Sequence, residues 1–202
     1  MTSMFDMQQT RDASSVIVSG DVPVAPAELL HPDELKQFGK LDASYKNEYL
    51  RSRYGAKLLV RERTGNAFNA VPIKKDTDGK PFVGGYPDLF LSITHAGGYA
   101  AAALSATRPV GIDIERVKPR HPALLRMTAT PKEAEALRQR FEPAELATLL
   151  WTCKEAAAKA DERLFPLADY RIQDGIATRG SSSWKLSSSQ HSSYIATLAV
   201  AA

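Results

Sequence analysis

The chain has 202 residues, of which 44% are hydrophobic and 24% charged, a composition that excludes a disordered chain and suffices for one large domain or two small halves. Its formal charge of +3 is compatible with an anionic ligand but too small to predict a nucleic-acid partner. A single cysteine excludes an internal disulfide, and no apolar run of signal or membrane length occurs, so we expect a cytoplasmic protein with no membrane partner.

The first element that the sequence predicts is helical and covers residues 27–63, with Pro32 near a helix start. Leu50, Tyr54 and Leu58 recur at four-residue spacing, which is typical of the buried face of a helix. A polar stretch follows, and its segment Asp76-Thr77-Asp78-Gly79 has the composition of a turn.

Short strands are predicted at residues 81–83, 90–94, 100–105 and 110–117. Between two of them, Ala96-Gly97-Gly98 suits a close approach of the backbone to a ligand. The last strand contains Val110-Gly111-Ile112-Asp113-Ile114-Glu115. Because alternate residues of a strand point to opposite faces, we expect Asp113 and Glu115 to project side by side while Ile112 and Ile114 enter the core.

Two helices are predicted next, at residues 131–140 and 143–163, the second burying Leu146, Leu149, Leu150, Cys153 and Ala157. This second helix contains Trp151-Thr152-Cys153-Lys154-Glu155-Ala156-Ala157-Ala158-Lys159. The four-residue step from Glu155 to Lys159 places both side chains on one outward face. If that face meets Asp113 and Glu115, three carboxylates suit Mg²⁺ and the ammonium suits a phosphate substrate.

The chain is expected to end in strands at residues 170–172, 183–187 and 193–200. A faint internal repeat accompanies them, in which His95, Tyr99, Ala102 and Leu104 are echoed by His191, Tyr194, Ala196 and Leu198. Such a repeat is what two similar α+β halves would show.

The two motifs resemble those of the 4′-phosphopantetheinyl transferases of the Sfp type, namely a G-[IV]-D element and, some forty residues on, a [FW]-x-x-K-E-x-x-x-K element. Gly79-Lys80-Pro81 resembles the Gly-Lys-Pro segment of that family, and Ser92-Ile93-Thr94-His95 resembles its S-[IV]-S-H segment, with threonine in place of serine. The resemblance implies an α+β, pseudo-twofold fold of two similar halves, residues 1–110 and 111–202, with the active site between them.

Enzymes of this family transfer the phosphopantetheine arm of coenzyme A to a serine of a carrier protein. The resemblance implies that Mg²⁺ on the pyrophosphate is held by Asp113, Glu115 and Glu155. Lys159 would bind the same group, and Glu155 would take the serine proton directly or through a metal-bound water. The 3′-phosphate side of coenzyme A would be bound in the first half by Lys36, Arg51, Ser52, Lys80, Pro81, Thr94 and His95.

The implied partners are coenzyme A and an acidic acyl, peptidyl or aryl carrier protein, and a chain with two halves is expected to work as a monomer. Residues 118–140 contain six basic residues against two acidic ones. This segment is a candidate surface for the carrier, or equally a solvated connection. The residues do not rank carriers of different pathways, nor do they say whether acyl-coenzyme A is accepted.

Simpler interpretations remain open at this level. Glu155 and Lys159 are also a common helix-stabilising pair, Trp151 is expected to pack, and Lys154 is left outside the catalytic set. A non-catalytic module that binds coenzyme A or a carrier protein is one alternative. A metal-dependent nuclease is a weaker one, because nucleases usually place their glutamate and lysine on adjacent strand positions.

Overall fold

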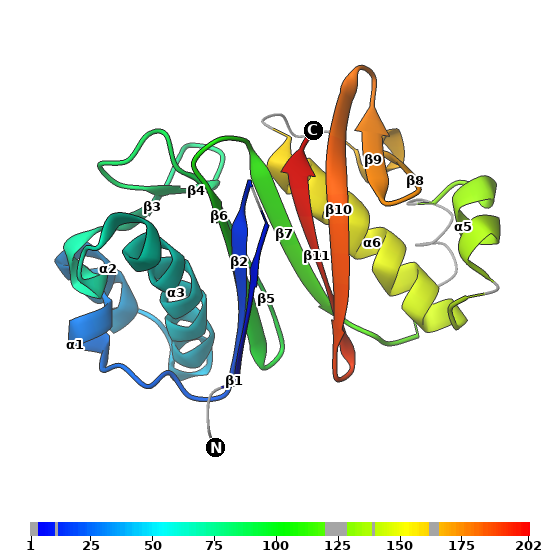
Figure 1. Ribbon diagram of the computed structural model, residues 1–202. Helices are drawn as coiled ribbons and strands as arrows, with labels where there is room; N and C mark the ends of the chain where they lie inside the picture. The colour runs from blue at the N-terminus through cyan, green and yellow to red at the C-terminus, as the bar shows by residue number, and fades with distance from the viewer. Residues whose placement is uncertain (1–3, 11, 120–128, 139, 162–165) are drawn as a thin grey trace. The chain divides into compact units, whose positions relative to one another are not determined.

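The computed structural model describes residues 4–10, 12–119, 129–138, 140–161 and 166–202. The chain divides into two compact units, Met1–Arg108 and Pro109–Ala202. Each unit contains an antiparallel sheet and one long helix (Figure 1), which confirms the predicted mixed α+β class. None of the described helices is long and apolar enough to cross a membrane.

The first unit is built on a sheet with the strand order β1-β2-β6-β5, and β3 and β4 form a separate hairpin. The long helix α3 packs against β2, β5 and β6, and α1 and α2 lie on its outer side (Figure 1). The elements are β1 (Met4–Gln9), β2 (Ser14–Ser19), α1 (Pro26–Leu29), α2 (Pro32–Gly39), α3 (Ala43–Thr64), η1 (Phe68–Ala70), β3 (Ile73–Lys75), β4 (Pro81–Val83), β5 (Phe90–Ala96) and β6 (Tyr99–Ser105).

The helical region predicted at residues 27–63 is confirmed and comprises three helices, α1, α2 and α3. His31 caps α2, since its Nδ1 accepts a hydrogen bond from the Asp33 amide and Pro32 occupies the first turn. The long helix α3 ends at Gly65, whose φ of +74° is the left-handed conformation that favours glycine. The buried core between helix and sheet includes Val16, Val18, Tyr54, Leu59 and Leu91.

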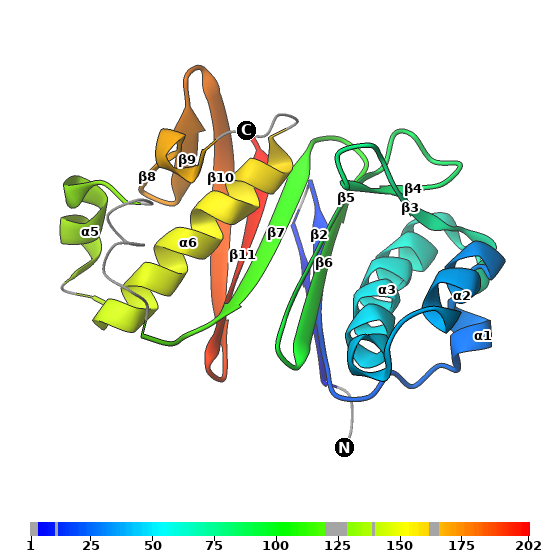
Figure 2. The ribbon, with the colours of Figure 1, turned by 180° about the vertical axis from the view of Figure 1, so that it is seen from behind.

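The second unit has one sheet with the order β7-β11-β10-β9-β8. Its long helix α6 crosses one face of this sheet, with α5 beside it (Figure 2). The elements are β7 (Val110–Arg116), α5 (Pro131–Arg138), α6 (Pro143–Ala160), η2 (Leu167–Asp169), β8 (Arg171–Gln173), β9 (Ile176–Arg179), β10 (Ser182–His191) and β11 (Tyr194–Ala201).

Small residues let α6 lie close to its sheet. Ala156, Ala157 and Ala160 pack with Ala199 and with the ring of Trp184 in one buried cluster. The start of the helix is fixed by a capping box between Glu142 and Glu145. The helix therefore begins and ends close to the predicted bounds of 143 and 163.

The two units repeat one order of elements. Among the described residues of each, a strand precedes a short helix, a long helix, a 3₁₀ turn, two short strands and a long hairpin, and the first unit has α1 in addition. The elements β2, α2, α3, β5 and β6 thus correspond to β7, α5, α6, β10 and β11. The central strand order β2-β6-β5 matches β7-β11-β10. Tyr99 and Tyr194 are equivalent, since each opens the second strand of its hairpin, but His95 corresponds to Gln190 rather than to His191. The repeat seen in the sequence therefore pairs the two tyrosines correctly. The other residues compared in it lie one position away from their structural equivalents.

Candidate functional site

The close approach of α6 to β7 depends on Gly111. A Cβ atom at this residue would lie 2.0 Å from the carbonyl oxygen of Ala156 and 2.6 Å from the amide nitrogen of Ala160. Only glycine fits at such a separation, because real Cβ atoms do not come so near to backbone atoms. The glycine of the first motif thus sets how deeply the helix carrying the second motif is seated.

The face of β7 that bears Gly111 also bears Asp113 and Glu115, because strand residues two apart share a face. Across from them, Glu155 and Lys159 are one helical turn apart on α6. Lys159 Nζ donates a hydrogen bond of 2.6 Å to Asp113 Oδ1, which joins the two motifs directly. Glu155 and Lys159 were expected to face outward, and both are partly exposed. Asp113, in contrast, has an exposed fraction of only 4%, because the helix covers this face of the strand.

The charges of this cluster act on Glu155. Burial raises the pKa of its carboxyl group above the usual value, and the negative charges of Asp113 and Glu115 raise this pKa further. Lys159 opposes the shift but does not cancel it. The cluster therefore has three carboxylates with one ammonium group, an excess of negative charge that favours a cation.

The three carboxylates are ligands that suit a hard divalent cation, but their side chains are not arranged around one position as in a metal site. In the part of the chain that the structure describes, no group of three histidine, cysteine, aspartate or glutamate side chains is arranged to hold a metal ion. The ammonium of Lys159 already binds Asp113 at 2.6 Å. A metal bound by these carboxylates would require Lys159 to give up part of that contact.

The positions of the first unit that correspond to the three carboxylates Asp113, Glu115 and Glu155 are apolar. The strand registers pair Val16 with Ala102 and Asp113 with Thr197, and these two pairs occupy the same place in the repeat. By the same registers Val18 corresponds to Glu115. On the long helices Lys57 and Lys154 each bind the glutamate of the short helix, so the next residues, Leu58 and Glu155, correspond. Val16 and Val18 are core residues, with Leu58 packed against them. The acidic cluster is consequently a feature of the second unit alone among the described repeat positions.

The first unit contains a cavity of about 830 Å³ between α2, α3, the β3–β4 hairpin and β5. Three residues of the predicted coenzyme A set line it, namely Ser52, Pro81 and His95. Ser52 Oγ is buried and has no hydrogen-bond partner among the described residues. His95 is half exposed, and its Nδ1 lies 3.2 Å from Glu48 Oε1.

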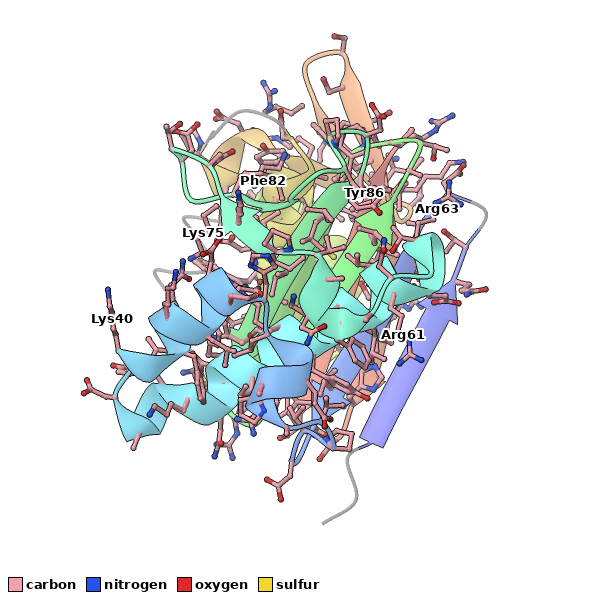
Figure 3. The ribbon with its side chains drawn as sticks, turned by 90° about the vertical axis from the view of Figure 1, so that its left-hand side faces the viewer. Lys40, Arg61, Arg63, Lys75, Phe82 and Tyr86 are labelled. Atoms are coloured by element: carbon pink, nitrogen blue, oxygen red, sulfur yellow. The ribbon has the colours of Figure 1, made fainter. Side chains whose placement is uncertain are left out.

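Further lining residues were not selected from the sequence. Arg53 lies 2.8 Å from Glu34 and stacks over the ring of Tyr49, with 4.7 Å between guanidinium carbon and ring centroid. Lys74 and Lys75 contribute two cations from β3, and Lys75 is seen on the hairpin near Phe82 in Figure 3. The adjacent positive charges of Lys74 and Lys75 before a predicted turn could have indicated a phosphate-binding role from the sequence. No local pattern indicates that Arg53 lines a cavity.

The other predicted residues of this set do not line the cavity. Lys36 is 76% exposed and pairs with Asp33 at 3.7 Å. Arg51 donates a hydrogen bond to the Gly20 carbonyl and lines a separate cavity of about 360 Å³ with residues 20–26. Thr94 is buried and alternates with the lining residues Ile93 and His95 along β5, while the Lys80 amide bonds to Asp76.

The basic segment predicted as a carrier surface falls partly outside the described residues. Arg120, His121 and Arg126 belong to the stretch 120–128, of which the structure describes nothing. In the described part, Lys132 and Arg138 are exposed on α5, and Arg138 pairs with Glu135 at 3.1 Å.

Comparison with known proteins gives a consistent result. A sequence model of the 4′-phosphopantetheinyl transferase superfamily matches residues 109–199. The chain is 32% identical over 90 residues to a holo-[acyl-carrier-protein] synthase of Bacillus subtilis strain 168, a match covering 40% of this chain and 74% of that protein.

Two longer relatives are matched in part. A 4′-phosphopantetheinyl transferase of Bacillus subtilis is 30% identical over 108 residues, or 50% of this chain and 48% of the relative. The 4′-phosphopantetheinyl transferase HetI of Nostoc sp. is 29% identical over 145 residues, or 66% of this chain and 60% of the relative. The matched regions thus span about half to three-fifths of these two transferases.

Proposed function

Because the chain belongs to the 4′-phosphopantetheinyl transferase superfamily, we propose that it transfers the 4′-phosphopantetheine moiety of coenzyme A to a serine of an acyl, peptidyl or aryl carrier protein. The second product is adenosine 3′,5′-bisphosphate. The observation that carries this proposal is the meeting of Asp113 and Lys159 at 2.6 Å beside Glu115 and Glu155. Both sequence motifs thereby contribute to one charged cluster.

In this proposal Asp113, Glu115 and Glu155 hold Mg²⁺ on the pyrophosphate of coenzyme A, since carboxylate oxygens are the ligands that Mg²⁺ prefers. The excess of negative charge that raises the pKa of Glu155 supports this role. When bound, the metal supplies neutralisation of the phosphate charge. Lys159 shifts from Asp113 to the phosphate oxygens, where its ammonium stabilises the charge that grows on the leaving group.

The transfer step exchanges one phosphorus–oxygen bond for another. The serine oxygen attacks the phosphorus that carries the pantetheine arm, and the bond from that phosphorus to the oxygen of adenosine 3′,5′-bisphosphate breaks. Glu155 accepts the serine proton, directly or through a water. A carboxylate beside the metal lies within reach of the attacking oxygen, which suits this task.

The cavity of the first unit is the proposed place of the 3′-phosphate end of coenzyme A. Ser52 and His95 supply donors there, and Lys74 and Lys75 supply positive charge to a phosphate. Lys36, Arg51, Lys80 and Thr94 stay in the proposal as residues around this end that do not line the cavity.

We further propose the Sfp-type arrangement, in which the two units are related by a pseudo-twofold axis and the substrate binds between them. The repeated order of elements supports this arrangement. A chain that contains both units would then act as a monomer, and its single, buried cysteine is compatible with the cytoplasm. The described cations of α5 support an acidic carrier as the partner.

Intact-mass analysis tests the function directly. An apo carrier protein incubated with this protein, coenzyme A and Mg²⁺ is expected to gain one phosphopantetheine arm, and EDTA is expected to abolish the gain. Asp113→Asn should lose at least two orders of magnitude in rate, while Glu28→Gln, a change of an exposed glutamate in the first unit, should not. Coenzyme A binding without transfer to several unrelated carriers would instead favour a non-catalytic binding module.

A further inference from the structure

A buried lysine precedes Glu155 and faces a buried carboxylate. Lys154 has an exposed fraction of 0%, and its Nζ lies 3.0 and 3.2 Å from the two oxygens of Glu133 on α5. The same carboxylate accepts hydrogen bonds from the amides of Thr130, at 2.6 Å, and Ile172, at 2.7 Å. One glutamate therefore ties together the start of α5, the middle of α6 and the strand β8.

The first unit contains the same construction at equivalent places. Glu34 of α2 binds Lys57 of α3 at 2.7 Å and accepts hydrogen bonds from the amides of His31 and Ile73. Arg53 adds a further ion pair to Glu34 at 2.8 Å. In both units the glutamate lies in the third position of the short helix, the lysine on the long helix, and the isoleucine in the strand that follows.

Lys154 is unable to serve a ligand in this position. Its ammonium is enclosed and shared between both oxygens of Glu133. Glu155, the next residue, points about 100° away around the helix axis and contributes to the acidic cluster instead. Two adjacent charged residues of the second motif thus face different neighbours.

The ion pair of Glu133 and Lys154 affects how the acidic cluster is assembled, because Lys154 and part of the cluster lie on the same helix, α6. The contact at Gly111 sets how near α6 comes to β7. The rotation of the helix about its own axis depends on side chains elsewhere on the helix, among them Thr152, whose Oγ1 lies 2.9 Å from Thr197 Oγ1. Lys154 restrains that rotation at another place on the helix, because its ammonium is bound to Glu133 of α5, and Glu133 in turn is hydrogen-bonded to the Ile172 amide of β8. A ligand site of carboxylates requires placement within about 0.5 Å, so a small rotation of α6 would disperse the cluster.

We propose that Glu133 and Lys154 are positioning residues that hold α6 in the rotation at which Glu155 and Lys159 meet Asp113. This inference rests on the proposed function for the identity of the ligand. A buried ion pair is on average no more stabilising than apolar residues of the same volume. Stability alone therefore does not account for the pair, which in both units joins the long helix to the short helix and to the strand that follows.

The test compares matched double variants. E133L/K154M replaces the pair of the second unit with apolar side chains, which avoids leaving one buried charge without its partner. E34L/K57M makes the same change in the first unit, where it also removes the carboxylate partner of Arg53 and is therefore the more destabilising of the two. Mn²⁺ binding is measured by titration calorimetry without coenzyme A, and the unfolding midpoint of each variant is measured by circular dichroism. E133L/K154M is expected to weaken Mn²⁺ binding at least tenfold, while E34L/K57M keeps it within twofold despite an equal or larger fall of the unfolding midpoint.

Two results would overturn the inference while the proposed function stands. One is Mn²⁺ binding by E133L/K154M within twofold of the unchanged protein, and the other is an equal loss in both double variants. If E133L/K154M does not fold, Glu133→Gln keeps the length and one acceptor oxygen, and it should weaken Mn²⁺ binding about threefold. Unaltered binding in that variant would equally overturn the inference. Failure of the unchanged protein to bind Mn²⁺ at all would overturn the metal site of the proposed function itself.

Discussion

Lys159 Nζ lies 2.6 Å from Asp113 Oδ1 and occupies a ligand oxygen of the proposed metal site. Its ammonium neutralises part of the charge of three carboxylates, as the pKa of Glu155 shows. The lysine is therefore both a competitor of the cation in the ligand-free protein and a phosphate ligand in the proposed transfer.

These two roles of Lys159 predict opposite effects of one substitution. Lys159→Met should leave Mn²⁺ binding unweakened or tighten it by about threefold, because removing a positive charge increases attraction for a divalent cation. The same variant should lose about 10²-fold or more in transfer rate, because no ammonium remains for the leaving group. Titration calorimetry and intact-mass kinetics measure the two effects.

The control for this prediction is Lys185→Met, which removes an exposed lysine from β10. It should change neither quantity by more than about twofold, as expected for a solvent-screened charge. Weaker Mn²⁺ binding in Lys159→Met would show that the lysine supports the metal site rather than competing for it.

Gly111→Ala should be strongly destabilising. The added Cβ would lie 2.0 Å from the Ala156 carbonyl oxygen, so α6 or β7 would have to move. Overpacking of a core costs about 1–3 kcal/mol, and a clash with backbone belongs at or above the upper end of that range. Urea unfolding followed by circular dichroism measures the loss.

Gly39→Ala is the matched change, because a Cβ there would have nothing within 4 Å. It should alter the unfolding free energy by less than about 1 kcal/mol. Similar stability of the two alanine variants would mean that α6 does not need its close approach to β7.

Some of this site could be predicted from the sequence and some could not. Alternation of Ile112, Asp113, Ile114 and Glu115 predicted the strand and the shared face of its two carboxylates, because the period of a strand is local. The burial of Asp113 was not predictable, since it follows from contact with a helix that begins 30 residues later in the chain.

The cavity of the first unit was beyond local patterns for a similar reason. Its lining comes from α2, α3, β3 and β5, and only their packing shows that Ser52 and His95 share a cavity. Lys36 was selected by position in the family pattern, but its exposure follows from the rotation of α2, which the buried Glu34 fixes. Strands β1, β2, β3 and β9 were not predicted, since β3 and β9 are short and β1 and β2 lay in a region considered only for targeting signals.

Glu155 should also make the stability of the metal-free protein depend on pH. Its folded pKa lies above its usual value because of burial and the charges of Asp113 and Glu115. In the unfolded chain the pKa returns to about 4.5. Between these two pKa values the folded state binds more protons than the unfolded state, so the contribution of Glu155 to stability falls as the pH rises through this window.

Glu155→Gln removes that dependence. The variant should have a higher unfolding free energy than the unchanged protein at pH 8 in EDTA, and the two should converge toward pH 4. It should also lose transfer activity, since an amide accepts no proton from the serine. Denaturation at several pH values measures the first effect. A variant less stable than the unchanged protein at pH 8 would contradict the assigned direction.

The cavity residues predict a difference between two lysines in binding adenosine 3′,5′-bisphosphate. Both lysines are exposed, but Lys75 lines the cavity, whereas Lys36 lies outside the lining. Lys75→Ala should weaken binding about tenfold, a typical loss for a charge-assisted hydrogen bond to phosphate. Lys36→Ala should weaken binding less, by about threefold, because Lys36 does not line the cavity and its charge acts on the phosphate through solvent. Calorimetry without metal separates this site from the acidic cluster. A larger loss in Lys36→Ala than in Lys75→Ala would place the phosphate at the exposed face of α2, in agreement with the family pattern and against the cavity.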